Sequence, residues 1–281
     1  MTFSLYAPAK INWFLNIISK RKDGYHDIMS SMHSINLYDT LIFQHSDSLH
    51  VDSEIEIPLT ENLVYRAAFN LKQKYSYKKG ATITIRKKIP VAAGLGGGSS
   101  DAAYTLLGLN MLWDLRLDKK ELSSIAFEIG SDVSFFLNGP LALVKGKGEV
   151  VCPLSIESSF MVVLVKPPIS VSTAWAYNKF DEANPSILTK SPIDIKLFCQ
   201  ALNKQDFTTL NIMLRNDLEK IVIDSYPVVG ELKNKMVENG ALYTAMSGSG
   251  PTVFGIFKNK AEAKKILDTI KPYWCYLANT M

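Results

Sequence analysis

The chain has 281 residues, of which 47% are hydrophobic and 21% charged, a composition that suits one large globular domain or two smaller ones. Its net charge of +4, from 31 basic and 27 acidic residues, is mild, and no basic block is interleaved with aromatic residues. We therefore expect no nucleic-acid partner, whereas anionic small molecules suit this charge.

The spacing of the cysteines and the length of the apolar runs indicate the cellular location to expect. Cys152, Cys199 and Cys275 are far apart and lack C-x-x-C spacing, which predicts reduced thiols and neither a disulfide framework nor a zinc site. The first residues, MTFSLYAPAKINWFLNII, have no basic leader and are interrupted by Lys10, so a strand is expected there and no signal peptide. The longest other apolar run, 160–165, falls short of the roughly 18 residues of a membrane span. A cytoplasmic protein without a membrane partner is predicted.

The first part of the chain alternates strands and helices. Short strands are expected at 3–5, 11–17 and 35–43, with a polar loop at 19–26. Residues 61–75 show apolar positions at helical spacing, and residues 81–89 alternate as a half-buried strand does. This strand runs into PVAAGLGGGSSDAA, and apolar residues then recur every three or four positions from Ala102 to Trp113. The order is strand, glycine loop, helix.

The glycine loop has the features of a phosphate-binding loop. Anion binding at a helix start needs free backbone N–H groups, positive φ and no side chain in the way, conditions that Gly94, Gly96, Gly97 and Gly98 meet. The hydroxyls of the following serines, in the N-cap region, suit a backbone amide or a phosphate oxygen. The predicted phosphate-binding residues are Val91, Ala92, Ala93, Gly94, Leu95, Gly96, Gly97, Gly98, Ser99, Ser100 and Asp101.

Other loops with similar letters do not match. A Walker A loop needs G-K-[ST], but Gly98 is followed by Ser99. A dinucleotide fingerprint lacks its last glycine in either frame, and the protein-kinase segments H-R-D and D-F-G do not occur. The structural alternative is a glycine-rich turn that only caps a helix.

The rest of the chain predicts a second domain. A helix at 119–129 and a β-rich stretch at 141–151 complete a first domain, 1–153, and 154–281 form the second. There we expect a strand at 160–166, the loop ISVSTAWAY, helices at 193–202, 207–214, 227–238 and 260–270, and strands at 241–246 and 252–257. The fold class is α+β.

Three sets of residues outside the loop are candidates for chemistry or binding. Lys10 and Asp132 could supply positive charge and align a hydroxyl for phosphoryl transfer, although Lys10 could equally be a surface lysine and Asp132 a helix N-cap. Tyr25 and His26 offer an aromatic face and an imidazole for a base, or a structural role. The segment Ser247-Gly248-Ser249-Gly250 is either a second backbone nest for an anion or a tight hairpin.

Three segments together resemble the GHMP kinases over nearly the whole chain. They are APAKIN at 7–12, PVAAGLGGGSSDAA at 90–103 and MSGSGPTVFGIF at 246–257, in that family's order and approximate spacing. The triple glycine and DGYHDI resemble a branch that phosphorylates a hydroxyl of a cytidine diphosphate-linked polyol in the non-mevalonate route to isoprenoid precursors. The resemblance implies an ATP-binding N-terminal α/β domain, a ferredoxin-like C-terminal domain, an active site between them, and Mg²⁺ accompanying ATP.

The resemblance also implies roles for single residues. Lys10 and Asp132 align with the catalytic pair, and Asn62 with an adenine contact. Asn12 would lie near the reacting hydroxyl, Tyr25 and His26 would hold the cytosine, and Tyr177 would close over its other face. The phosphate-proximal loop would be Ser247, Gly248 and Gly250. Trp13, Asn16 and Ser131 depart from the usual pattern at positions that bear on substrate fit.

The chemistry of phosphoryl transfer limits what the catalytic pair can do. An aspartate is too weak a base to deprotonate a hydroxyl before the new bond forms. We therefore expect Asp132 to orient the hydroxyl and accept its proton late, while Lys10 stabilises the transferring phosphoryl group.

Two other hypotheses remain: a GHMP kinase with another acceptor, such as homoserine or mevalonate, and a catalytically silent nucleotide-binding regulator. A monomer or weak homodimer is expected. The sequence singles out no metal-ligating residue, and protein ligands of Mg²⁺ stay open.

Overall fold

The computed structural model describes residues 2–55, 57–184 and 193–281, a mixed α+β chain as expected. It divides into two compact units. The first comprises Met1–Ala9, Leu37–Val91 and Gly96–Gly139, and the second comprises Lys10–Asn36, Ala92–Leu95 and Pro140–Met281. Two long strands, β1 (Thr2–Lys20) and β2 (His26–Ser46), each pass from one unit into the other. The glycine loop does the same.

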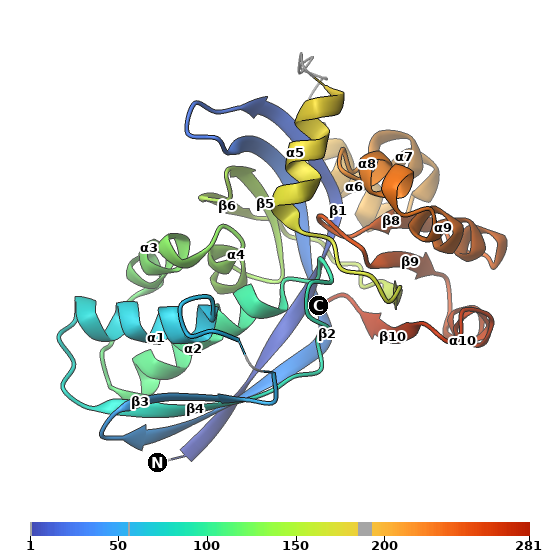
Figure 1. Cartoon of the computed structure of the whole chain (residues 1–281). Coiled ribbons are helices and arrows are strands. Elements are labelled where there is room, and N and C mark those ends of the chain that lie inside the picture. The colour runs from blue at the N-terminus through green and yellow to red at the C-terminus, as the bar shows by residue number, and fades with distance from the viewer. Residues whose placement is uncertain (1, 56, 185–192) are drawn as a thin grey trace. The chain divides into compact units, whose positions relative to one another are not determined.

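The first unit combines strands with a group of helices. β4 (Gly80–Arg86) pairs in parallel with β3 (Leu49–Ser53) and antiparallel with β2, in a register that runs from Thr40 opposite Arg86 to Ser46 opposite Gly80. The parallel pair is joined through α1 (Leu63–Lys74), because parallel neighbours need a crossover. Figure 1 shows α1 and α2 (Gly97–Leu112) lying along one face of β3 and β4.

The helices of this unit follow the sequence signals. α3 (Lys119–Ile129) has the predicted bounds and begins with a capping box, in which Asp118 accepts from the backbone of Glu121 and the Glu121 side chain accepts from that of Asp118. Most apolar positions of α2 are buried, among them Ala102, Leu106 and Leu109. The short α4 (Val133–Leu137) packs against α2 and α3.

The second unit contains two sets of paired strands. Residues 28–33 of β2 pair with β5 (Leu141–Gly146), which pairs with β6 (Val150–Pro153). An antiparallel four-stranded sheet has the order β10-β7-β9-β8, formed by Trp274–Asn279, Met161–Lys166, Val253–Phe257 and Tyr243–Met246. Its helices are α5 (Thr173–Ala183), α6 (Ile195–Lys204), α7 (Phe207–Met213), α8 (Glu219–Ser225), α9 (Val228–Glu238) and α10 (Lys260–Thr269).

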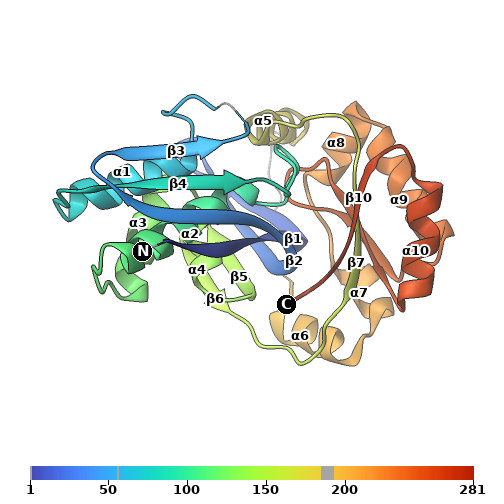
Figure 2. The same ribbon diagram turned by 90° about the horizontal axis from the view of Figure 1, so that it is seen from below.

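Apolar side chains from this sheet and its helices form one core. α9 contacts β8 and β9, and α10 contacts β7, β9 and β10, on the side of the sheet that Figure 2 shows covered by both helices. Val163 and Val253 from the strands meet Leu232 and Met236 from α9 and Ile266 from α10, each at most 1% exposed. This packing holds the β8–β9 connection, which carries the third GHMP-like segment.

Several predicted elements differ from the structure. The three short strands expected near the amino terminus are two long strands, β1 and β2, because polar residues inside them, such as Asn12, Ser30 and Ser34, are buried and break the apolar pattern. The loop expected at ISVSTAWAY is largely helical, since α5 begins at Thr173 after the N-cap Ser172. β3, α8 and β10 were not predicted.

The predicted division at residue 153 differs from the two compact units, because 10–36 and 140–153 fall in the second unit. The division into two domains there stays a prediction. Cys152, Cys199 and Cys275 are free thiols in the structure. No helix within the described ranges has both the length and the apolar character needed to cross a bilayer.

Candidate functional site

Lys10 lies inside the second unit and is tied to two neutral oxygens. Its side chain is 3% exposed, and Nζ donates to Oδ1 of Asn12 at 2.6 Å and to the carbonyl of Gly94 at 2.9 Å. Its backbone N–H donates to the carbonyl of Leu95 at 2.9 Å. The alternative that Lys10 is a surface lysine is wrong. Strand β1 holds this ammonium group in a fixed position beside the glycine loop.

Asn12 is the second polar group of this strand and is also buried. While Oδ1 accepts from Lys10, Nδ2 donates to Oγ of Ser30 at 2.8 Å, and that hydroxyl donates to the carbonyl of Phe14 at 2.6 Å. Asn12 is 1% exposed and Ser30 is fully buried. Buried polar groups with all partners in place are rigid, so this chain of hydrogen bonds fixes the orientation of the amide that positions Lys10.

The glycine loop and the β8–β9 connection meet at Gly94. Ser247 Oγ donates to the carbonyl of Gly94 at 2.9 Å, the same carbonyl that accepts from Lys10. Gly94 has φ of +74°, and a Cβ there would lie 2.2 Å from the carbonyl oxygen of Ser247. Only glycine fits this position. Lys10 and Asn12 from APAKIN, Gly94 from the loop and Ser247 from MSGSGPTVFGIF therefore share one network.

The β8–β9 connection fits the hairpin interpretation of its sequence, and the nest for an anion stays a prediction. It joins two antiparallel strands as a hairpin does, with the Ser247 N–H donating to the carbonyl of Thr252 at 2.9 Å. Gly248 and Gly250 also take positive φ, +57° and +83°, and a Cβ on Gly248 would lie 3.1 Å from Lys10 Nζ. Asn216, which the sequence did not point to, donates to the carbonyls of Met246 and Gly248 and fixes the connection.

The start of α2 differs slightly from the sequence prediction. The N-cap residue is Gly96, in the left-handed region at φ of +71°, and no side chain caps the helix. Ser99 and Ser100 lie inside the first turn of the helix, whereas the sequence predicted them in the N-cap region before it. The Ser100 hydroxyl is buried without a hydrogen-bond partner. The first backbone N–H groups of α2 are thus left for an anion, as a phosphate-binding helix start requires.

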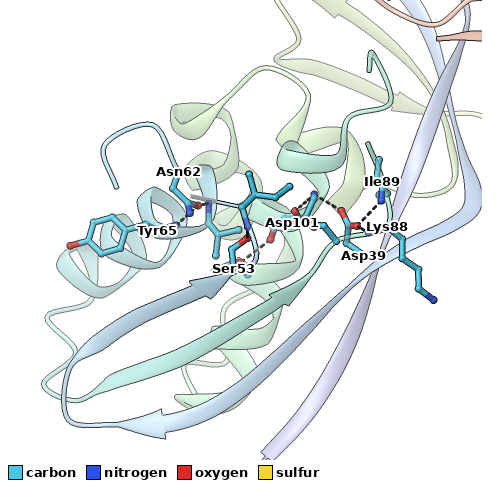
Figure 3. Close-up of polar contacts among 11 residues, drawn as sticks. Asp39, Ser53, Asn62, Tyr65, Lys88, Ile89 and Asp101 are labelled. Atoms are coloured by element: carbon cyan, nitrogen blue, oxygen red, sulfur yellow. Dashed lines mark hydrogen bonds and ion pairs between the residues drawn. The ribbon is translucent and has the colours of Figure 1, made fainter. Parts of the chain in front are cut away.

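Asp101 occupies a buried ion-pair network of the first unit. Lys87 Nζ lies 2.7 Å from Oδ2 of Asp101 and 2.5 Å from Oδ2 of Asp39, as the dashed contacts around Asp39 and Asp101 in Figure 3 illustrate. Burial, with a smaller contribution from Asp39 and against the attraction of Lys87, raises the pKa of Asp101 to about 7. Sequence reasoning missed Asp39 and Lys87, because their contact spans 48 residues.

Asp132 stands at the N-cap position of α4, half-buried, but its side chain makes no capping hydrogen bond. The alternative that Asp132 serves as the helix cap is correct about the position of Asp132, but the side-chain hydrogen bond of a helix cap is not made. The helix start positions the carboxylate, but the carboxylate does not bond to the backbone of that helix. This arrangement is compatible with a chemical role. Its pairing with Lys10 in catalysis stays a prediction.

Asn62 caps α1, a role that the sequence did not predict. Oδ1 accepts from the backbone N–H groups of Val64 and Tyr65, at 3.0 and 3.3 Å, and Figure 3 shows the amide turned toward the helix start. Because the cap engages Oδ1, the side-chain NH₂ is the group suited to a nucleotide base. The adenine contact stays a prediction.

His26 and Tyr177 form a rigid aromatic pair in the second unit. Their rings stack at a centroid distance of 4.9 Å and an interplanar angle of 27°, and His26 Nε2 lies 2.7 Å from Oδ1 of Asp181. Tyr177 and Asp181 are one turn apart on α5, so the helix holds the imidazole by its face and by its edge. Burial opposes ionisation of Asp181, but hydrogen bonds from Lys20 and His26 lower its pKa.

Tyr25 presents its ring to solvent. It is 61% exposed, and Lys147 Nζ lies 5.0 Å from the ring centroid. An exposed aromatic face beside a buried imidazole suits stacking on a base.

Asp181 was missed by the sequence reasoning, although its spacing of four from Tyr177 would have indicated it once the segment was known to be helical.

Two of the unusual positions in the first strand are structural. Trp13 is fully buried and packs edge-on against Phe160 and Phe254, and its indole N–H donates to Nδ1 of His33 at 3.1 Å. Asn16 is 2% exposed and donates to the carbonyl of Arg215. Both side chains belong to the interior of the second unit. The bearing of Trp13, Asn16 and Ser131 on substrate fit stays a prediction.

Comparison with known proteins agrees with these features. The GHMP kinases N-terminal domain pattern matches residues 62–140 and the GHMP kinases C-terminal pattern matches residues 198–274. The 4-diphosphocytidyl-2-C-methyl-D-erythritol kinase of Thermodesulfovibrio yellowstonii is 44% identical, over 98% of this chain and 96% of its own. The protein of the same name from Shouchella clausii is 41% identical, over 97% and 92%.

Solved structures give the same result. A crystal structure of 4-(cytidine 5'-diphospho)-2C-methyl-D-erythritol kinase matches with a TM-score of 0.85 and 29% identity, over 99% of each chain. The homoserine kinase of Cytophaga hutchinsonii shares the fold, with a TM-score of 0.74 and 20% identity over 100% of this chain and 94% of its own. The branch indicated by the triple glycine and DGYHDI is the one that these relatives name. The α+β fold is confirmed, and the chain belongs to the GHMP kinase family.

Proposed function

We propose that the protein transfers the γ-phosphoryl group of ATP to the 2-hydroxyl of 4-diphosphocytidyl-2-C-methyl-D-erythritol, in the non-mevalonate route to isoprenoid precursors. The observation that carries the proposal is the identity of 39–44% to kinases of that name over nearly the full chain. The protein is thus an ATP-dependent kinase with an alcohol acceptor. The buried network around Lys10 and Gly94 supports the chemistry.

The roles proposed for the residues follow from their surroundings. The phosphates of ATP lie on residues 91–101, where the start of α2 offers uncapped N–H groups. Lys10, oriented by Asn12, stabilises charge on the transferring phosphoryl group, and Asp132 orients the acceptor hydroxyl and takes its proton late. His26, Tyr25 and Tyr177 receive the cytosine.

Mg²⁺ is proposed to accompany the nucleotide. Within the described ranges no group of three or more His, Cys, Asp and Glu residues gathers to hold a metal ion. Mg²⁺ in phosphoryl-transfer sites is often held by phosphate oxygens, waters and one or two protein oxygens. The buried Ser100 hydroxyl, which lacks a partner, and the neighbouring Ser99 fit that need. When bound, the ion neutralises charge on the phosphates.

The substrates fix the setting in which the protein works. We propose that it acts in the cytoplasm on ATP and the cytidine diphosphate-linked polyol as a monomer or weak homodimer, without nucleic-acid or membrane partners. The mild net charge and the free thiols support this setting.

An ADP-release assay over a panel of acceptors tests the proposal. ADP should form with 4-diphosphocytidyl-2-C-methyl-D-erythritol and not with homoserine or mevalonate, which belong to kinases that share only the fold. CMP and CDP should compete with the acceptor, because the aromatic site holds cytosine. Turnover of homoserine or mevalonate alone would overturn the acceptor assignment. A protein that binds ATP but turns over none of the three would be a nucleotide-binding regulator.

A further inference from the structure

The ion-pair network beneath the phosphate loop ties together the two ends of that loop. Asp39 Oδ2 binds Nζ of Lys87, while Asp39 Oδ1 accepts from the backbone N–H groups of Lys88 and Ile89, at 2.6 and 2.8 Å. Lys87 in turn binds Asp101 at 2.7 Å. Figure 3 shows Asp39 between Ile89 and Asp101. The loop leaves the network at Lys88 and returns to it at Asp101.

The span between these ends needs such support. Between Ile89 and Asp101 the backbone takes left-handed φ at Ala92, Gly94 and Gly96, of +50°, +74° and +71°. A non-glycine residue such as Ala92 in that region is strained. Glycines adopt such angles freely and do not enforce them, so the geometry of the segment depends on its contacts, which are the bonds to the Gly94 carbonyl and the fixing of its two ends.

The network is buried and unevenly satisfied. Asp39 is fully buried and Asp101 is 3% exposed. Asp39 accepts hydrogen bonds from three donors. Asp101 accepts from Lys87 through Oδ2, and its Oδ1 is buried without a hydrogen-bond partner. Two carboxylates outweigh one ammonium, and a proton on Asp101 would balance the charge. An arrangement this costly to bury is a poor source of stability and calls for another explanation.

We propose that Asp39, Lys87 and Asp101 are positioning residues that clamp both ends of the phosphate loop and so hold it in the conformation that receives the nucleotide. Asp101 then acts through the loop backbone, although its place in the glycine-serine segment first suggested direct contact with ATP. The inference rests on the proposed function, in which this loop holds the phosphates of ATP.

Substitution of Asp101 tests the clamp on the full chain. Asp101→Leu removes the tie to Lys87, and we expect ADP to bind at least about tenfold more weakly, measured calorimetrically without acceptor. The KM for ATP should rise by a similar factor, while kcat at saturating ATP and the KM for the acceptor change by less than about threefold. Asp101→Asn keeps an oxygen for Lys87 and should restore ADP affinity to within about threefold of wild type.

Trp113→Phe is the matched control for lost stability. Trp113 ends the same helix at its far end, is 5% exposed, and its indole N–H donates to the carbonyl of Gly80. This variant should lose stability and keep wild-type ADP affinity. Should Asp101→Leu fail to fold, Lys87→Gln, which retains one donor for the two carboxylates, is expected to weaken ADP binding in the same way.

The outcomes separate the clamp from the proposed function. A folded Asp101→Leu variant with wild-type ADP affinity would overturn the clamp, and so would a loss in Trp113→Phe as large as that in Asp101→Leu. If wild-type protein binds no ADP, the proposed function itself fails. If the wild type binds ADP and turns over the acceptor while the Asp101 and Lys87 variants bind equally well, only the clamp is wrong.

Discussion

Lys10 and Lys87 lie in different surroundings, Lys10 buried at 3% exposure and Lys87 half-buried. Lys10 donates to an amide oxygen and a backbone carbonyl, whereas Lys87 lies between two carboxylates. The amide and carbonyl acceptors fix the place of the Lys10 ammonium group, while the two carboxylates beside Lys87 outweigh the charge of its ammonium group. The comparison teaches that burial alone does not identify a catalytic lysine. The two lysines differ in what their contacts position: Lys10 is held beside Gly94, and Lys87 joins Asp39 to Asp101.

The largest effect is expected on the catalytic side of this comparison. Asp132→Asn should fold normally and lower kcat by about 10² to 10⁴, because the amide no longer accepts the proton of the hydroxyl. Steady-state kinetics with thermal unfolding measures both quantities. Asp114→Asn, at an exposed aspartate paired with Arg116, is the control and should leave kcat unchanged. Near-wild-type turnover of Asp132→Asn would remove Asp132 from the mechanism.

The same substitution at the two lysines breaks or confirms the comparison directly. Lys10→Met should lower kcat by about 10² to 10³ and leave nucleotide affinity nearly intact, since Lys10 acts on the transferring phosphoryl group. Lys87→Met should instead cost about 3–5 kcal/mol of the free energy of unfolding, because it leaves two buried carboxylates without their cation. Kinetics and denaturant titration of both variants test the contrast. Equal losses of kcat and affinity in Lys10→Met would argue for a binding role.

Glycines of the phosphate loop give a second matched pair. Gly94→Ala should destabilise the protein by several kcal/mol or prevent folding, because its Cβ would lie 2.2 Å from the Ser247 carbonyl at positive φ. Gly98→Ala meets its nearest atom at 3.7 Å and lies within helix α2. Gly98→Ala should therefore raise the free energy of unfolding by about 0.5–1 kcal/mol and also raise the KM for ATP. Similar unfolding midpoints for the two variants would contradict the structure at Gly94.

The pKa of Asp101 predicts a pH dependence of stability. Burial raises this pKa from 3.8 to about 7 on folding, so the folded state binds more protons between those values. The contribution of Asp101 to stability is therefore complete below about pH 4 and is lost as the pH rises through about 7. Asp101→Asn should remove this loss. Denaturant titrations of both proteins across this range would show a widening difference, and a constant difference would refute the shift.

The smallest effect is expected at the aromatic pair. Asp181→Asn weakens the hold on the edge of His26, and the KM for the acceptor should rise by about three- to tenfold with kcat unchanged. Glu182→Gln, at the next residue of α5, pairs with exposed Lys179 and serves as the control. A change confined to the KM for ATP would separate Asp181 from the acceptor site.

Residues that carry a local signal could be predicted, and residues that act over long distances could not. Gly94 and Gly96–Gly98 indicate a phosphate loop because glycines at a helix start leave backbone N–H groups open to an anion, and the predicted bounds of α3 match the structure. Asp39 and Lys87 look like ordinary strand residues until the fold joins them, 48 positions apart. α5 was missed because its start, which follows Pro167-Pro168, was interpreted as a loop, and the partnership of Asp181 and His26 was missed with it.

The burial of Lys10 illustrates the same limit. Strand periodicity allows a lysine on either face, and the contact of Lys10 with the carbonyl of Gly94, 84 residues away, exists only in the folded chain. Family resemblance supplied its role before the structure supplied its surroundings. Physical reasoning on the sequence therefore identified the loop, while tertiary structure was needed to distinguish the two lysines beside it.

Phosphorus NMR of a reaction mixture tests the central claim most directly. Wild-type protein with ATP, Mg²⁺ and 4-diphosphocytidyl-2-C-methyl-D-erythritol should produce ADP and one new phosphomonoester signal in equal amounts, and Lys10→Met and Asp132→Asn should produce neither at a comparable rate. Formation of ADP with inorganic phosphate and no phosphomonoester, or no consumption of ATP by folded wild-type protein, would contradict the assignment of this chain as a kinase for that acceptor.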